Sequence, residues 1–417
     1  MNLGDTDLDS KGRAFETFMG SFFRGNFGQY FTPREIVKFI VDVLPIKHDS
    51  KVLDTSCGSG GFLLYALNKV RNEATAYYPN YRNDARQYAK WFPYWHDFAE
   101  KNLYGIEINE QISRAAKMNM IIHDDGHTNV ITSDGLVSDE TIFSNTSNHG
   151  FMYGTFDFII TNPPFGSTIR QSEQAYLKTY QLGKKEEDWL AVKATPANTR
   201  EGQSTEVLFI EQDYKFLKEG GYLAIVLPDG ILTNSSMQYV RTQIEDWFRI
   251  IAVISMPQTA FAANGAGVKS SVLFLRKWKK EETERFIQTK QNIESKLLKD
   301  SDYLALRSLW DREIKQKQKA NAEEIKGKQR ISVTAAKKTE EYKLWNSNLQ
   351  TEYASKIDEL KTRLTEEYQQ SKQQQLQDYP IFMAIAEEIG YDATGKKTAT
   401  NELDLIGKEL KKFIATL

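Results

Sequence analysis

The spacing of apolar and polar side chains divides the sequence into three stretches of different character. Residues 12–23 and 33–44 place apolar side chains at intervals of three and four, which predicts helices, and a glycine-punctuated loop over 24–32 joins them. Between about 51 and 278, short strand-forming runs alternate with helical ones. Beyond 279 the chain is rich in Lys, Glu and Gln and has few strand formers.

The central stretch contains seven runs that predict strands. Because strands separated by helices form parallel sheets, we expect an α/β fold with a mostly parallel sheet covered by helices on both faces. The loop between the last two runs is too short for a long crossover helix, so one of these strands is expected to run antiparallel. The seven runs are 51–56, 103–108, 129–134, 156–162, 222–228, 249–257 and 270–278.

The C-terminal stretch predicts further helices. Apolar residues from Tyr342 to Tyr368 recur at an average step of about 3.7 residues, closer to a straight helix than to the 3.5 of a left-handed coiled coil. The plain interpretation is a long helix that packs on its own domain or on a partner. Residues 380–414 are expected to form a helix, a glycine-rich turn and a final helix. The stripe consists of Tyr342, Trp345, Leu349, Tyr353, Ile357, Leu360, Leu364 and Tyr368.

Composition narrows the class of protein. With 417 residues, 40% of them hydrophobic, the chain can bury at least one large core. No run approaches the roughly 18 apolar residues of a membrane span and the first residues lack a signal-peptide pattern, so we expect an intracellular, cytoplasmic protein that does not bind a membrane. The single cysteine, Cys57, cannot form an intrachain disulfide, in keeping with a reducing compartment. Lys and Arg (54) nearly balance Asp and Glu (56), so binding to nucleic acid would need a local patch or a partner.

Candidate chemistry begins at the end of the first predicted strand. In "VLDTSCGSGGFLLYAL", 52–67, Asp54 ends the strand, and Gly58, Gly60 and Gly61 lead into a helix. Glycines let a ligand approach the backbone, and the N-terminus of a helix offers unpaired N–H groups. Many α/β proteins need such a turn only to change direction, so this segment alone is a weak indication of a binding site.

Three further predicted strands end in polar side chains at the edge where open α/β sheets bind ligands. The second strand ends at Glu107, whose carboxylate can accept hydrogen bonds from ribose hydroxyls. The third ends in "SDGL", where Asp134 can accept from an adenine amino group, and the fourth ends at Asn162. Each acid alone could equally be a loop cap or a solvated charge. Polar residues at the corresponding ends of four strands, taken together, favour a ligand site. An insertion at 71–101 with nine aromatic residues separates the glycines from Glu107.

The segment "NPPF", 162–165, forms a stiff turn because both prolines fix φ. The Asn162 side-chain oxygen and the Pro163 carbonyl can accept both hydrogens of one NH₂ group. Accepting both favours a pyramidal nitrogen whose lone pair can attack an electrophile, and Phe165 offers a stacking face for a base. An isolated Asn-Pro-Pro would more simply be an Asx-Pro turn that ends a strand. After a glycine loop and two acids in register, the catalytic interpretation is favoured.

Together these segments resemble a known enzyme family. In this order, "DTSCGSGG", "GIEIN", "SDGL" and "NPPF" resemble the motifs of S-adenosylmethionine-dependent methyltransferases that act on DNA adenine. The segment "GQYFTPREIVKFIVDVL", 28–44, is similar to the one that precedes the glycine loop in the modification (M) subunits of type I restriction-modification systems. Residues 208–232, 267–278 and 385–397 resemble later parts of the same family, so the resemblance covers most of the chain.

The resemblance implies a fold, a reaction and a set of site residues. It implies a Rossmann-like methyltransferase fold with an N-terminal helical segment, 1–48, a catalytic domain, 49–279, and a C-terminal helical region, 280–417, for docking of a partner subunit. The implied reaction is direct methyl transfer from S-adenosylmethionine to N6 of a flipped-out adenine, without a metal. The resemblance assigns the cofactor to Gln29, Tyr30, Phe31, Thr32, Pro33, Arg34, Asp54, Gly58, Ser59, Gly60, Gly61, Glu107, Asp134 and Leu136, and the target base to Asn162, Pro163, Pro164 and Phe165.

The resemblance also implies partners: double-stranded DNA, a specificity subunit that reads the site, a restriction subunit and a second M subunit. No base-reading module follows the catalytic sheet and the net charge is only -2, so the chain alone is expected to methylate poorly. Two departures from the family stand out. Only the last part of the usual N-terminal helical domain is present, so we expect a truncated chain, and Thr55-Ser56 replaces the commoner Pro-Ala.

Several alternatives stay open. A related turn occurs in methyltransferases of RNA bases or protein glutamine, and a DNA clamp or scaffold without turnover would share the fold. We interpret Cys57 as a small packing residue rather than a nucleophile. The segment "HDDGH", 123–127, has metal-type residues, but Gly126 disfavours a helical pairing of its histidines, so no metal site is predicted. The aromatic insertion could line a nucleic-acid channel or form a self-packed lid.

Overall fold

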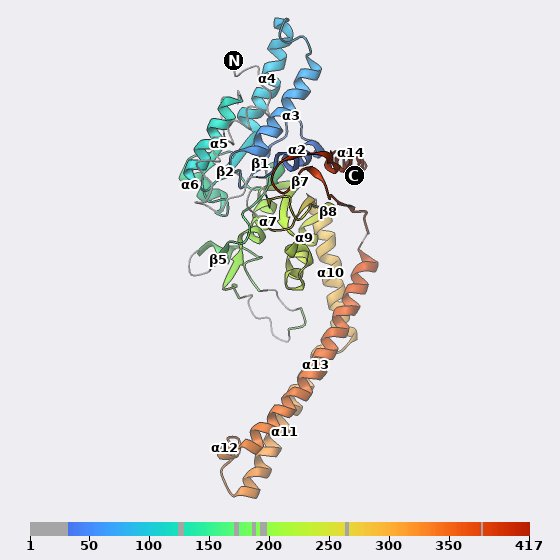
Figure 1. The fold of residues 1–417 in the computed structure, drawn as a ribbon. Coiled ribbons are helices and arrows are strands. Elements are labelled where there is room, and N and C mark those ends of the chain that lie inside the picture. Colours follow the sequence, from blue (N-terminus) through green and yellow to red (C-terminus); the bar gives the residue numbers. More distant parts are fainter. Residues whose placement is uncertain are drawn as a thin grey trace. The chain divides into compact units, whose positions relative to one another are not determined.

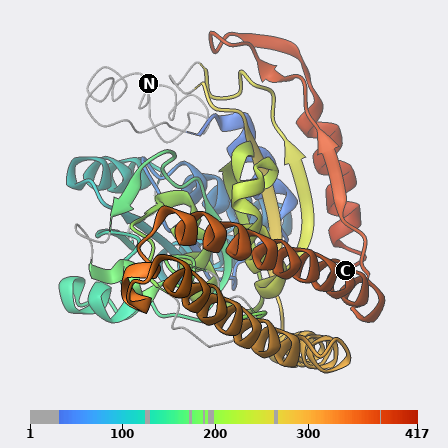
Figure 2. The ribbon, with the colours of Figure 1, turned by 90° about the horizontal axis from the view of Figure 1, so that it is seen from below.

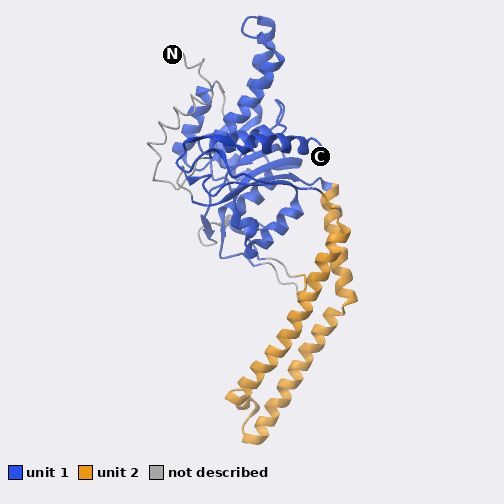
Figure 3. Ribbon diagram, turned by 45° about the vertical axis from the view of Figure 1, so that its right-hand side comes forward, with its two compact units in different colours: residues 1–185, 198–280, 380–417 blue, residues 186–197, 281–379 orange. Residues whose placement is uncertain are grey.

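The chain divides into two compact units, which Figure 3 distinguishes by colour. The first unit comprises 1–185, 198–280 and 380–417, and the second comprises 186–197 and 281–379. All candidate site residues belong to the first unit. The computed structural model describes residues 32–123, 129–170, 175–185, 189–191, 198–262, 267–376 and 378–417.

One eight-stranded sheet forms the centre of the first unit (Figures 1 and 2). The strand order is β3-β2-β1-β4-β7-β9-β8-β10, and β9 alone is antiparallel to its neighbours in this sheet. The predicted mostly parallel sheet with one antiparallel strand is therefore confirmed. The strands are β1 (Val52–Asp54), β2 (Leu103–Glu107), β3 (Asn129–Thr132), β4 (Phe156–Thr161), β7 (Leu217–Pro228), β8 (Phe248–Ser255), β9 (Ser270–Lys277) and β10 (Phe382–Ile385).

The eighth strand, β10, corrects the prediction of a helix that begins at 380. Residues 382–385 pair in parallel with β8, and β11 (Ile389–Tyr391) and β12 (Lys397–Asn401) follow as an antiparallel hairpin. Met, Ala and Glu favour helices locally, but the open edge of β8 offers a hydrogen-bonded ladder that local propensity does not reveal. The final helix is present as predicted, as α14 (Glu402–Ile414).

Helices cover both faces of the sheet. One hydrophobic cluster joins α2, α3, α4, α5 and α14 to the face on which Ile160 lies, and a second joins α6, α7, α8 and α9 to the face of Ile159. Since neighbouring residues of β4 enter different clusters, the central strands are buried on both sides. The helices are α2 (Arg34–Val43), α3 (Gly61–Tyr77), α4 (Ala85–Asn102), α5 (Glu110–Ile122), α6 (Asp139–Thr146), α7 (Thr205–Phe216), α8 (Asp229–Thr233) and α9 (Gln238–Trp247).

Short elements occupy the long connection between β4 and α7. The strands β5 (Thr168–Arg170) and β6 (Gly202–Ser204) pair antiparallel, and the 3-10 helix η2 (Ala175–Thr179) lies between them in the chain. A second 3-10 helix, η3 (Ser235–Met237), precedes α9. Across the described ranges, no helix has both the length and the apolar character needed to cross a membrane.

The described part of the second unit consists mainly of helices, all but one of them long, and is drawn in orange in Figure 3. They are α10 (Lys280–Asp300), which begins at the boundary, α11 (Tyr303–Gln329), α12 (Val333–Ala336) and α13 (Glu340–Gln375). The apolar stripe of α13 is buried or half-buried, and Leu364 packs with Tyr303 of α11. The hydroxyl of Tyr353 donates to Glu313 Oε2 of α11 at 2.7 Å. The predicted long helix is confirmed, and it packs on its own unit.

Candidate active site

Four neighbouring strands deliver the predicted side chains to one edge of the sheet. Asp54 ends β1, Glu107 ends β2, and Asn162 directly follows β4. Asp134 lies just beyond the end of β3. These strands are adjacent and parallel, so their carboxyl ends meet at the same edge. The structure thus brings together side chains that are far apart in the sequence.

The glycine loop after β1 is joined to the end of β2 by a carboxylate. The backbone N–H of Gly58 donates to Glu107 Oε2 at 3.1 Å, and that of Asn109 donates to Glu107 Oε1 at 2.8 Å. Gly58 (φ +52°) and Gly60 (φ +83°) adopt left-handed backbone conformations, and a Cβ on Gly58 would meet no atom within 4 Å. Any other residue would pay about 1–2 kcal/mol for such a conformation. The loop therefore needs glycine for its shape and leaves space beside Gly58.

The loop after β3 is held tightly against its neighbours. The backbone N–H of Leu136 donates to Asp134 Oδ1 at 2.9 Å, while the Leu136 side chain is buried. A Cβ on Gly135 would lie 2.5 Å from the carbonyl oxygen of Thr55 and 3.0 Å from the ring of Phe209. Gly135 is required because the loop passes directly over the backbone of the first loop. The half-buried Asp134 carboxylate is thereby fixed close to the glycine segment.

Asn162 contacts the segment that precedes α2. Its Nδ2 donates to Thr32 Oγ1 at 3.0 Å. Its Oδ1 is buried and has no hydrogen-bond partner among the described residues. Buried polar atoms are rarely left unpaired because that costs about 1–3 kcal/mol. An unpaired acceptor at a strand end can receive a hydrogen bond from a ligand.

The rest of the "NPPF" turn is anchored on both sides. Pro163 is buried and Pro164 is exposed, but the carbonyl of Pro164 accepts a hydrogen bond from Thr205 Oγ1 at 2.9 Å. Phe165 is half-buried, with its ring centroid 6.4 Å from that of Phe261 in an edge-on arrangement. Thr205 is the first residue of α7, so this helix fixes the turn.

The predicted cofactor segment before α2 is only partly described. Thr32, Pro33 and Arg34 are described, whereas Gln29, Tyr30 and Phe31 lie outside the described residues. Pro33 caps α2, and its carbonyl accepts from the N–H groups of Ile36 and Val37. A Cβ on Gly61 would lie 4.0 Å from a methyl group of Val37, so α2 lies beside the glycine loop.

A buried polar network lies beneath the loops and includes both residues that depart from the family pattern. Thr55 Oγ1 donates to Asp213 Oδ1 at 2.8 Å, and Ser56 Oγ lies 2.7 Å from Thr161 Oγ1. Burial is the main cause that raises the pKa of Asp54 to about 7; hydrogen bonds from Ser56 and Thr161 oppose it, and the charge of Glu107 adds a smaller upward contribution. Burial also raises the pKa of Asp213 well above its usual range. The hydroxyl groups of Thr55 and Ser56 thus connect β1, β4 and α7.

Three helix residues that support the site were not identified from the sequence. Asn119 of α5 donates to the carbonyl of Ser59 at 2.9 Å, Thr205 holds the "NPPF" turn, and Asp213 pairs with Thr55. A signal existed for one of them, since Asn119 is a polar residue between Met118 and Met120. Their partners could not be deduced because they lie in distant parts of the chain.

The structure also bears on two residues that the sequence singled out. Burial raises the pKa of the Cys57 thiol well above its usual range, which disfavours the thiolate and fits a packing residue. His123 is buried, with Nδ1 2.7 Å from the carbonyl of Asn119. The second histidine of "HDDGH", His127, lies outside the described residues.

The aromatic insertion forms much of the α3–α4 hairpin, and its rings contact one another. Tyr81 stacks on Trp91 with centroids 4.0 Å apart, and the Trp91 and Trp95 centroids are 5.4 Å apart. The guanidinium of Arg71 lies 4.1 Å from the Trp95 ring. These contacts favour the self-packed interpretation over a stacking channel, although Tyr88 is 48% exposed.

Comparison with known proteins decides the family. The sequence model described as N-6 DNA Methylase matches residues 6–362. The chain belongs to the N-6 DNA methylase family. This membership confirms the resemblance that the order of motifs indicated.

Individual relatives of this N-6 DNA methylase are distant. It is 25% identical over 260 residues to the type I restriction enzyme EcoEI methylase subunit of Escherichia coli, covering 61% of this chain and 43% of that protein. It is 26% identical over 278 residues to the type II restriction enzyme and methyltransferase RM.BcgI of Heyndrickxia coagulans, covering 65% and 35%. A methyltransferase subunit of a type I restriction-modification system from Streptococcus thermophilus matches with a TM-score of 0.46 and 20% identity, covering 67% and 52%. The chain thus spans less than half the length of these curated relatives.

Proposed function

We propose that this chain methylates N6 of adenine in DNA, with S-adenosylmethionine as the methyl donor. The observation that carries the proposal is Asn162 at the end of β4, whose amide is oriented by Thr32 and whose Oδ1 has no partner among the described residues. Family membership and the parallel placement of Asp54, Glu107 and Asp134 support it. The arrangement is suited to a nucleoside: carboxylates can accept hydrogen bonds from its hydroxyl and amino groups beside a glycine loop.

The residues at the strand ends fit S-adenosylmethionine. Bound there, the cofactor would supply a methyl group already activated by the positive sulfur. Gly58 leaves open space beside the backbone, and Glu107 and Asp134 offer acceptors for ribose hydroxyls and for the adenine amino group. The segment from Gln29 to Arg34 and the loop from Ser59 to Gly61 would contribute further contacts.

The target adenine would be held by the "NPPF" turn. Asn162 Oδ1 and the Pro163 carbonyl would accept the two hydrogens of the exocyclic amine, which keeps its lone pair available for the methyl group. Phe165 would stack on the base, a contact worth about 1–3 kcal/mol. Since Oδ1 is covered in this structure, the proposal requires that it becomes accessible when the flipped-out base enters.

Positioning would provide most of the catalysis. Holding the two reactants in line can supply about 7–11 kcal/mol, and no protein nucleophile is needed. The raised pKa of Cys57 argues further against a covalent route. Thr205, which fixes Pro164 from α7, would preserve the geometry of the turn.

The chain would act as the modification subunit of a type I complex in the cytoplasm. A specificity subunit would read double-stranded DNA, and a second modification subunit and a restriction subunit would complete the assembly. Two findings support this: several relatives are named as type I restriction enzyme methylase subunits, and the net charge is only -2. The proposed docking region is the C-terminal part of the chain, 280–417, which comprises the long helices of the second unit and the elements β10 to α14.

Transfer of a labelled methyl group tests the proposal. The full chain is incubated with labelled S-adenosylmethionine and double-stranded DNA, RNA or a glutamine-containing protein, with and without a specificity subunit. We expect labelled N6-methyladenine in DNA, mainly with the specificity subunit present. Label only in RNA or protein would refute the DNA substrate, and binding of DNA without any transfer would favour a scaffold.

Substitution of Asn162 tests the site. Asn162→Ala should lower methylation by at least about a hundredfold, as for removal of one preorganised group that stabilises a transition state. Cofactor affinity, measured by calorimetry, should change little. The exposed Asn145→Ala is the matched control and should keep full activity. Comparable turnover in Asn162→Ala would refute the assignment.

A further inference from the structure

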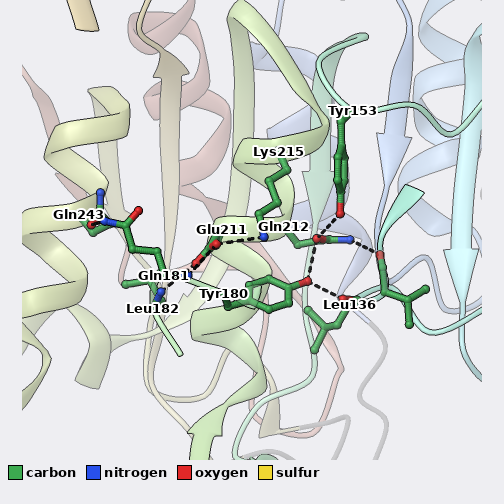
Figure 4. A network of polar contacts seen from close by, with 10 residues as sticks. Leu136, Tyr153, Tyr180, Gln181, Leu182, Glu211, Gln212, Lys215 and Gln243 are labelled. Carbon is green, nitrogen blue, oxygen red and sulfur yellow. Dashed lines mark hydrogen bonds and ion pairs between the residues drawn. The ribbon is translucent and has the colours of Figure 1, made fainter. Parts of the chain in front are cut away.

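The segment from Tyr180 to Leu182 is fixed to α7 by a buried carboxylate. Glu211 accepts hydrogen bonds from the backbone N–H groups of Gln181 at 2.9 Å and Leu182 at 2.8 Å (Figure 4). Lys215 forms an ion pair with Glu211 at 3.0 Å, and Glu211 is only 3% exposed. This segment follows the "NPPF" turn in the chain. Because Glu211 binds its backbone N–H groups, the segment is anchored before any ligand binds.

Tyr180 connects this segment to the loop after β3. Its hydroxyl donates to the carbonyl of Leu136, at 2.5 Å, and lies 2.7 Å from Gln212 Oε1. The ring is 1% exposed and packs in one cluster with Leu136 and Phe209, and Lys215 Nζ lies 3.9 Å from its centroid. Both the ring and the hydroxyl of Tyr180 therefore hold Leu136.

Gln212 of α7 holds the next carbonyl of the same loop. Its Nε2 donates to the carbonyl of Val137 at 2.8 Å, and its Oε1 accepts from the hydroxyl of Tyr153 at 3.2 Å (Figure 4). Gln212 is fully buried. Two consecutive carbonyl groups, those of Leu136 and Val137, are thus bound by two buried side chains.

These contacts determine where Asp134 lies. The Asp134 carboxylate accepts a hydrogen bond from the backbone N–H of Leu136 at 2.9 Å, and the carbonyl of the same residue is held by Tyr180, so the placement of Leu136 constrains the carboxylate. We propose that Tyr180 and Gln212 are positioning residues that aim Asp134 at the purine end of the cofactor. This inference rests on the proposed function. Neither residue belongs to a motif, and both act through the loop rather than by touching the ligand.

A comparison of two tyrosines and two nucleosides tests the inference. Tyr180→Phe removes the hydroxyl that holds Leu136, whereas Tyr153→Phe removes a hydroxyl that bonds to the same Gln212 Oε1. The ligands are S-adenosylhomocysteine and S-inosylhomocysteine, which differ at the position that Asp134 would recognise. Their affinities for the full chain are measured by calorimetry, and thermal unfolding without ligand shows whether each variant is folded.

The expected result is a loss of selectivity for the purine. Tyr180→Phe should weaken binding of S-adenosylhomocysteine about three- to tenfold, the net effect of one buried hydrogen bond, and binding of S-inosylhomocysteine less than about twofold. Tyr153→Phe should change both affinities by less than about twofold. If Tyr180 had a merely structural role, its substitution would weaken binding of both ligands equally. That result, or an unchanged affinity of Tyr180→Phe for both, would overturn the inference.

Two further outcomes are informative. If Tyr180→Phe does not fold, Gln212→Met is judged by the same selectivity criterion. If the unmodified chain binds neither ligand, the proposed function fails and takes the inference with it. Binding by the unmodified chain with unchanged selectivity in the variants would refute the positioning role alone.

Discussion

A single buried carboxyl group, Asp213, links the pH dependence of stability to the candidate site. Burial raises its pKa well above the usual range, and the charge of Asp54 adds to this effect. The folded chain therefore keeps this proton over a pH range in which the unfolded chain has lost it. Its contribution to stability is fully present below the unfolded pKa, at about 4, and is lost as pH rises towards the folded pKa.

Replacing Asp213 by a residue that does not ionise should remove the loss of stability at higher pH. Because asparagine does not ionise, Asp213→Asn should gain stability relative to the unmodified chain as pH rises from about 4 to 8. Asp392 is the matched control of opposite sign, since hydrogen bonds from Thr394 and the backbone of Lys396 lower its pKa. Asp392→Asn should lose relative stability only as pH rises towards about 4 and should change little between about 4 and 8. Melting temperatures measured from about pH 2 to 8 cover both windows, and parallel curves for all three proteins would contradict the prediction.

At the scale of elements, helices α5 and α7 each support one half of the site. Asn119 of α5 binds the carbonyl of Ser59 in the glycine loop, and Thr205 of α7 binds the carbonyl of Pro164 in the target turn. The two contacts therefore predict separable effects on cofactor binding and on turnover.

Substituting each residue tests this division. Asn119→Ala should weaken cofactor binding about two- to tenfold, the net value of a hydrogen bond, with little change in rate at saturating cofactor. Thr205→Val should lower that rate by a similar factor and leave cofactor affinity unchanged. Calorimetry measures cofactor affinity, and methylation in the presence of a specificity subunit measures the rate. Each variant is the control for the other. Identical profiles would contradict separate roles.

The sequence allowed most of the elements to be predicted because their patterns are local. All seven predicted strands form, and the residues at their ends meet because parallel strands share one carboxyl edge. β10 was missed since its ladder with β8 depends on a contact between distant segments. The contacts of Tyr180, Thr205 and Asp213 were missed for the same reason: each joins residues that no spacing relates.

At the scale of the whole molecule, each compact unit has its own hydrophobic core. Leu364 is fully buried in the helical unit, and Ile225 of β7 is fully buried in the sheet unit. We therefore expect two transitions in thermal unfolding. Leu364→Ala should destabilise the helical unit by about 2–5 kcal/mol, and Ile225→Ala should destabilise the sheet unit by a similar amount.

Calorimetry with and without cofactor assigns the transitions. A ligand that binds the folded sheet unit should raise the midpoint temperature of that unit's transition and leave the helical unit's unchanged. Leu364→Ala should lower only the midpoint of the helical unit and Ile225→Ala only that of the sheet unit, so each variant is the control for the other. A single transition that both variants lower would contradict independent cores.

The order of synthesis gives β10 a further consequence. This strand is translated after the entire helical unit, yet it pairs with β8, which is translated before that unit. The edge of β8 is therefore not paired with β10 until that strand has been translated. Gly407 of α14 emerges later still and packs against Phe39 of α2, the helix that follows Thr32. A premature stop within the helical unit would release a chain with an exposed strand edge, prone to aggregate.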